Sequence, residues 1–167
     1  MEYSISYGAA STPKIQCINP HTDKWMVRWD YQVEDEESGN VRFAEAVFMH
    51  KPELMEIKEV VISYFNEVIN QNIYNFKWNE YDVYLSMENQ QNYKGAYDLA
   101  RDTDGANLPV MFKFGGTFEP QYHEFKTFDE LRDFYFAAIA HISMKLEEGW
   151  QIKDSIDWSE YDVENLD

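Results

Sequence analysis

The sequence predicts an α+β fold built from three units, each a β-hairpin followed by an amphipathic helix. In each unit, apolar residues first alternate with polar ones, as in a strand, and then recur every three or four residues, as in a helix. A turn signal separates the two strands, and a helix-start signal precedes the helix. We therefore expect a mostly antiparallel sheet with the three helices packed on one of its faces.

The first unit is predicted over residues 25–70. Every second residue is apolar or aromatic from Trp25 to Val33, and the alternation resumes from Val41 to Met49 after a charged loop that contains Gly39. Pro52 suits the first position of a helix, because the N–H that proline lacks would have no helical partner there. The apolar stripe that follows predicts a helix over residues 52–70.

The second unit is predicted over residues 73–101. Aromatic and aliphatic residues alternate on both sides of a turn at Asn79-Glu80, which predicts a second hairpin. Ser86 is suited to cap the next helix, and Glu88 places negative charge where the helix dipole favours it. The helix itself is expected over residues 87–101.

The third unit is predicted over residues 108–148. A strand from Leu108 to Phe114 is followed by a Gly115-Gly116 turn and a return strand near residues 122–125. Thr127 and Glu130 have the spacing of a capping box, in which each side chain satisfies a free backbone N–H of the first helical turn. We expect a helix over residues 128–148, ended by Gly149.

The predicted domain organisation has three parts. Residues 1–23 are expected to be an N-terminal extended segment, with at most a short edge strand near residues 14–17. Residues 24–150 are expected to form one α+β domain. Residues 151–167 carry six acidic residues and one lysine together with Trp158 and Tyr161, which predicts an acidic, aromatic tail that docks on its own domain or on a neighbour.

Composition limits the partners that the chain can bind. With 31 acidic and 14 basic residues its formal charge is −17, so its surface would repel a phosphate backbone, and we predict no direct nucleic-acid binding. The apolar runs are shorter than the roughly 20 residues needed to span a bilayer, so no membrane partner is expected. Cys17 is the single cysteine, which excludes an internal disulfide and a cysteine-based zinc site.

Catalytic motifs are not recognisable in the sequence. The four histidines lack the spacing of metal ligands, no nucleophile elbow is present, and the Gly115-Gly116 pair is explained as a hairpin turn. We therefore predict a protein that is not an enzyme. It is expected to have no catalytic or metal-binding residues, no cofactor and no small-molecule substrate.

Two groups of polar and aromatic side chains are the candidates for partner binding. The first is a run of four amides at the start of the second helix, which could donate hydrogen bonds to a partner or could instead cap and hydrate the helix start. The second is a set of aromatics near the C-terminus, because a large aromatic ring at the centre of an interface often carries much of its binding energy. The residues are Asn89, Gln90, Gln91 and Asn92, and Trp150, Trp158 and Tyr161.

Several segments resemble a known group of proteins. They are FKWNEYDVYLSMENQQNYKGAYDLA, LPVMFKF, YHEFKTFDELRDFY and GWQIKDSIDW. These segments resemble small uncharacterised proteins of phages and prophages of anaerobic gut bacteria, and are loosely similar to a domain of unknown function in tail-fibre-like phage proteins. The resemblance spans residues 24–158. It departs from the family pattern at Tyr84, where tryptophan is usual, and at Gly95, where alanine would favour the helix.

The resemblance implies a non-enzymatic bacteriophage structural protein. It would be made in the host cytoplasm and assembled into the virion as a tail, neck or fibre-attachment component. Its partners would be other virion proteins, with self-association left open. The charge of −17 leaves an alternative function, an acidic phage-encoded inhibitor or DNA mimic that binds a basic host protein.

Overall fold

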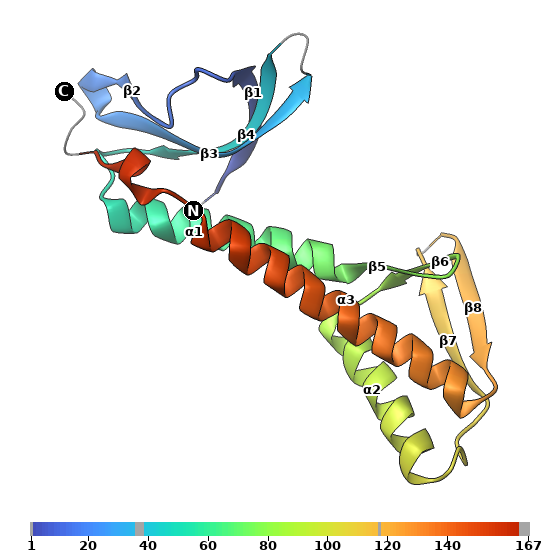
Figure 1. Cartoon of the computed structure of the whole chain (residues 1–167). Helices are drawn as coiled ribbons and strands as arrows, with labels where there is room; N and C mark the ends of the chain where they lie inside the picture. The colour runs from blue at the N-terminus through green and yellow to red at the C-terminus, as the bar shows by residue number, and fades with distance from the viewer. Residues whose placement is uncertain (1, 36–38, 117, 164–167) are drawn as a thin grey trace. The chain divides into compact units, whose positions relative to one another are not determined.

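The chain folds into an α+β structure (Figure 1). The computed structural model describes residues 2–35, 39–116 and 118–163, and within them it has three α-helices and eight strands, all paired antiparallel. The α+β class and the three successive hairpin and helix units are therefore confirmed. The structure divides into two compact units: unit 1 consists of residues 1–66 and 153–167, and unit 2 consists of residues 67–152. This division differs from the single domain expected over residues 24–150.

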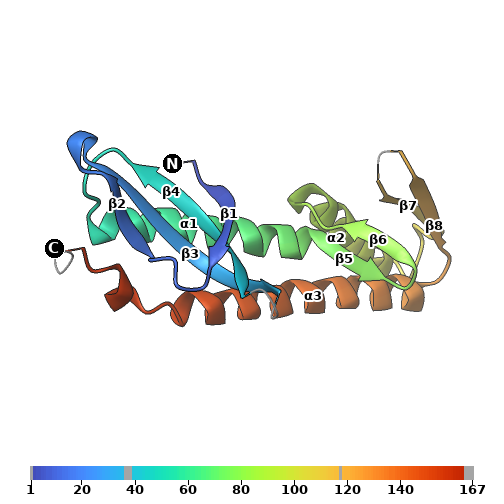
Figure 2. The same cartoon turned by 90° about the horizontal axis from the view of Figure 1, so that it is seen from above.

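Unit 1 contains a four-stranded sheet. Its strands are β1 (Ser4–Ala9), β2 (Ile15–Asn19), β3 (Lys24–Asp35) and β4 (Asn40–Phe48), in the order β1-β4-β3-β2, which can be followed in Figure 2. The short edge strand expected near residues 14–17 is present as β2, which pairs with β3 at one edge of the sheet. Strand β1 was not expected, and it pairs with β4 along its whole length at the other edge.

The core of unit 1 lies between this sheet and the first part of helix α1 (Leu54–Tyr74). Trp29 is fully buried as its alternation predicts, and its ring packs edge-on against Tyr64 of α1, with ring centroids 5.8 Å apart. The Tyr64 hydroxyl also donates a hydrogen bond to Asp30. Pro52 is buried just before the helix, which begins at Leu54 and runs four residues beyond the predicted end.

The C-terminal residues belong to the same unit. Helix α3 (Phe128–Asp154) extends past Gly149, and a short 3₁₀ helix, η2, follows at Trp158–Tyr161. Tyr161 is only 3% exposed, and its hydroxyl donates to the backbone carbonyl of Arg28, 3.2 Å away. Glu160 forms an ion pair with Lys14 of unit 1. The predicted tail therefore docks on its own chain through Glu160 and Tyr161, and its first residues, up to Asp154, are helical; residues 164–167 of the predicted tail lie outside the described residues.

Unit 2 contains two hairpins, the last residues of α1, all of α2 and most of α3. The strands β5 (Asn75–Trp78) and β6 (Tyr81–Tyr84) form one two-stranded sheet, and β7 (Val110–Gly115) and β8 (Pro120–Phe125) form another. The chain therefore has three separate sheets where one was expected. Aromatic side chains, among them Tyr81 and Phe114 with ring centroids 5.4 Å apart, fill the space between the two hairpins, which do not share a hydrogen-bonded ladder.

Helices α2 (Met87–Asp102) and α3 pack on these hairpins around Phe134, which is fully buried. Its ring contacts rings from β5, α2, β7 and β8: Phe76, Trp78, Tyr93, Phe112, Phe114 and Phe125. The predicted helix starts are confirmed, because Ser86 Oγ accepts from the Asn89 N–H and Thr127 Oγ1 accepts from the Glu130 N–H. The Glu130 carboxylate accepts from the Lys126 N–H, one residue before the position that a capping box uses.

Gly149 does not end α3, contrary to the prediction. It lies inside the helix and is buried against Ile69 of α1, where a Cβ atom would come within 2.2 Å of the isoleucine side chain. The absence of a side chain therefore allows the two helices to approach closely within unit 2.

Candidate functional site

A groove of about 210 Å³ opens on unit 2 between α2 and α3. Its α3 side is formed by Tyr135, Ile139 and Ile142, which share one face because they are spaced four and three residues apart. Its α2 side includes Met87 and Lys94, again on one face of the helix. The groove is a consequence of this packing: α2 crosses beside the N-terminal half of α3, as Figure 1 shows, and the large buried rings hold the two helices apart.

Apolar side chains at the rim of the groove are exposed. Met87 is 65% exposed and Ile139 is 44% exposed, although both are large and apolar. Phe136, three residues before Ile139 on α3, is 52% exposed. An exposed apolar surface that borders a groove is typical of a protein-binding site. We call Met87, Gln91, Tyr135, Ile139 and Ile142 the groove residues.

The four predicted amides divide into two pairs. The side chain of Asn89 donates to the Tyr84 carbonyl (2.8 Å) and that of Gln90 to the Leu85 carbonyl (2.8 Å). These two amides connect the start of α2 to the end of β6. Gln91 and Asn92 are exposed, and Gln91 lines the groove.

The three predicted aromatics lie in different surroundings. Trp150 is 54% exposed on α3 and stands eleven residues after Ile139, which puts the two on the same side of the helix. Trp158 is half-buried, with the Lys58 ammonium 5.4 Å from its ring centroid. Tyr161 is a core residue of unit 1, so its prediction as a partner contact was wrong. Spacing along the tail could not show that η2 would turn this ring inward.

Sequence reasoning missed the α3 side of the groove. The ring of Tyr97 on α2 stacks on Tyr135 with centroids 4.6 Å apart, and it also stacks on Phe128. Neither these rings nor Ile139 were among the predicted partner-binding residues. A signal was present in the sequence: residues 134–144 contain no Asp, Glu, Lys or Arg, although the chain as a whole is highly charged.

Burial also affects the chemistry of the groove floor. Tyr93 lies beneath the groove and is 4% exposed, and burial raises its pKa to about 12. The phenol is therefore neutral at physiological pH. It contributes an apolar ring to the floor of the groove and no charge.

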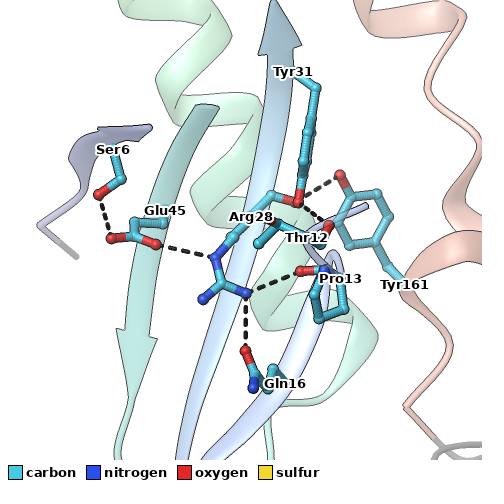
Figure 3. A network of polar contacts seen from close by, with 8 residues as sticks. All are labelled: Ser6, Thr12, Pro13, Gln16, Arg28, Tyr31, Glu45 and Tyr161. Carbon is cyan, nitrogen blue, oxygen red and sulfur yellow. Dashed lines mark hydrogen bonds and ion pairs between the residues drawn. The ribbon is translucent and has the colours of Figure 1, made fainter. Parts of the chain in front are cut away.

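A second cluster of polar groups lies in unit 1 and is drawn in Figure 3. Arg28 of β3 is 8% exposed, and its Nε donates to the Glu45 carboxylate of β4 at 3.1 Å. The same guanidinium donates to the Pro13 carbonyl at 2.9 Å, and Ser6 of β1 donates to the other oxygen of Glu45. The Arg28–Glu45 ion pair thus has hydrogen-bond partners in β1 and in the segment before β2. We interpret this cluster as structural, because it joins β1, β3, β4 and that segment.

His123 is the most enclosed histidine in the described part of the chain. Its Nε2 lies 2.8 Å from Glu130 and its Nδ1 lies 3.3 Å from the Tyr81 hydroxyl. Its ring packs edge-on against Trp78 and Phe125. Both ring nitrogens thus have a partner inside unit 2, and the side chain links β8 to the start of α3.

The described residues contain no group of three or more histidine, cysteine, aspartate or glutamate side chains arranged to hold a metal ion. No helix among them combines the length and apolar character needed to cross a membrane. Comparisons of the chain with protein-family models, curated proteins and solved structures find no match.

Proposed function

We propose that this chain is a non-enzymatic structural or assembly protein of a phage particle, which binds another virion protein through the groove between α2 and α3. The observation that carries the protein-binding part is the exposed apolar rim of that groove, with Ile139 at its centre. The phage setting is supported by the resemblance of the sequence to phage and prophage proteins.

The size of the groove favours a side chain of a protein over a small-molecule ligand. Its volume of about 210 Å³ lies below the roughly 300–1,000 Å³ of typical ligand sites. It exceeds the roughly 150 Å³ that holds a benzene ring in an engineered cavity. One large apolar side chain would therefore fill it, and such an inserted residue is the usual centre of a protein interface.

The proposal is tested by asking whether the protein is part of the particle. Particles of the phage that encodes it would be purified on a density gradient and washed at high salt, and their proteins quantified by mass spectrometry. We expect the chain at a fixed copy number that high salt does not reduce, because apolar contacts are not screened. Absence from the washed particles would contradict the structural role.

The charge supports a second candidate, an inhibitor that binds a basic host protein. Unit 1 carries 17 acidic and 7 basic residues, and unit 2 carries 14 and 7. This function predicts that the chain is missing from particles and is captured with one host nucleic-acid-binding protein at low salt. Capture should then fall steeply as salt is raised, because exposed charges are screened.

A further inference from the structure

We infer that the partner segment seated in the groove is an amphipathic helix, which inserts one large apolar side chain and carries Lys or Arg beside its apolar stripe. The inference rests on the proposed function, because it names the chemistry of the partner at the same groove. Three features of unit 2 support the inference: the walls of the groove, the charges around the groove, and the length of the stretch of α3 that lacks charged residues.

The walls of the groove favour a helical partner over an extended one. Both walls are α-helices, whose backbone N–H and C=O groups are already bonded within α2 and α3. An extended partner would have to leave its own backbone groups without partners where it is buried, which costs free energy at each group. A helix satisfies its own backbone and presents only side chains to the groove.

The charges around the groove favour a basic partner. The bases that α2 and α3 contribute to unit 2 are already paired: Lys94 with Asp98, Arg101 with Asp98 and Asp102, Arg132 with Asp129 and Asp133, and Lys145 with Glu148. Glu88, which follows the lining residue Met87 in the first turn of α2, is exposed and forms no ion pair with any residue that the structure describes. Lys or Arg on the partner would therefore meet an unpaired carboxylate, whereas Asp or Glu would be repelled.

The stretch of α3 without Asp, Glu, Lys or Arg sets the length of the contact. Residues 134–144 carry no Asp, Glu, Lys or Arg and cover about 16 Å of helix, or about three turns. Within them Phe136, Ile139 and Met144 are exposed. A partner stripe of about three turns matches this length, and its basic residues then fall at or beyond the ends of the uncharged stretch.

The test uses the full chain and three labelled synthetic peptides. One is a Leu/Lys peptide with a three-turn apolar stripe, one is a scrambled peptide of the same composition, and one is the Leu/Glu counterpart with the same stripe. Fluorescence anisotropy should show the Leu/Lys peptide binding at least about tenfold tighter than either other peptide. The scrambled peptide controls for non-specific attraction to the charge of −17.

Variants of the chain locate the binding. Ile139→Ser should weaken binding of the Leu/Lys peptide at least about tenfold. Met111→Ser, at an exposed residue of β7, should leave that affinity unchanged. Glu88→Gln should weaken binding of the Leu/Lys peptide about two- to fivefold and reduce the salt dependence of that binding. Circular dichroism of each variant confirms that the helices are intact.

Four outcomes would overturn the inference. If the scrambled peptide binds as tightly as the Leu/Lys peptide, charge alone attracts both. If Ile139→Ser binds the Leu/Lys peptide with unchanged affinity, the peptide binds elsewhere on the chain. A dimer in sedimentation experiments that Ile139→Ser dissolves would make a second copy of the chain the occupant. If Ile139→Ser is excluded from phage particles while no peptide is preferred, the partner chemistry is wrong and the proposed function stands.

Discussion

Gly149 shows how a single position controls the packing of α3. Because its Cβ would come within 2.2 Å of Ile69, the helices of unit 2 have no room for alanine there. Gly95 in α2 is the opposite case, since nothing lies within 4 Å of the place a Cβ would occupy. The sequence presents both as glycines near helix-forming residues, and their local surroundings do not distinguish them. Only the position of Ile69, 80 residues earlier, does so.

We predict that the two glycine-to-alanine substitutions have opposite effects. Gly149→Ala should lower the free energy of unfolding by about 1–3 kcal/mol, because the core is overpacked. Gly95→Ala should raise it by up to about 1 kcal/mol, because alanine favours an exposed helix. Urea denaturation followed by circular dichroism measures both. Equal effects of the two substitutions would contradict the close packing of Gly149 on Ile69.

The buried phenol of Tyr93 predicts a loss of stability at alkaline pH. Its pKa in the folded chain, about 12, exceeds the value of about 10 that a tyrosine has in an unfolded chain. Stability is therefore constant below pH 10 with respect to this group and falls as pH rises from 10 to 12, by about 1.4 kcal/mol for each pH unit. Tyr93→Phe should reduce that fall in urea unfolding measured at several pH values. Tyr122→Phe, at an exposed residue of β8, is the matched control and should leave the fall unchanged.

Among the elements, the helices and hairpins with strong local signals could be predicted from the sequence. Alternation predicted β3 to β8, and the caps at Ser86 and Thr127 predicted where α2 and α3 begin. The strand β1 also alternates, with Ile5 and Tyr7 between Ser4, Ser6 and Gly8, but this alternation does not say where the strand pairs. Its partner in β4 lies some 30 to 40 residues away, and no local pattern in SISYGA identifies the sheet edge that it covers.

The C-terminal element gives a prediction about stability. Tyr161→Ala should lower the free energy of unfolding of unit 1 by roughly 3–5 kcal/mol, because a buried aromatic ring is lost. Tyr161→Phe keeps the ring and removes the hydrogen bond to the Arg28 carbonyl, so it should cost only about 1 kcal/mol. Limited proteolysis near Ser155, combined with urea denaturation, measures the release of the tail. A Tyr161→Ala chain as stable and as protease-resistant as the unchanged chain would contradict the docking of η2.

At the scale of the whole molecule, the class of the fold followed from the sequence, but the grouping of its strands did not. Local alternation identifies strands without saying which of them share a ladder, and the rings of Tyr81 and Phe114 occupy the space where a common sheet would have joined the two hairpins. The candidate site shows the same limit. Gln91 was predicted from the amide cluster, whereas Ile139 was not among the predicted partner-binding residues, because a helical stripe does not reveal which of its members a second helix leaves uncovered.

In the proposed function, the groove between α2 and α3 binds a protein of the particle. The most direct measurement compares incorporation of Ile139→Ser and Met111→Ser into phage particles, with a phage deleted for the gene and complemented by each variant. Both residues are exposed and apolar, but only Ile139 lines the groove. We predict that Ile139→Ser is depleted at least about tenfold from purified particles, while Met111→Ser is incorporated normally. Normal incorporation of a folded Ile139→Ser chain would contradict the claim.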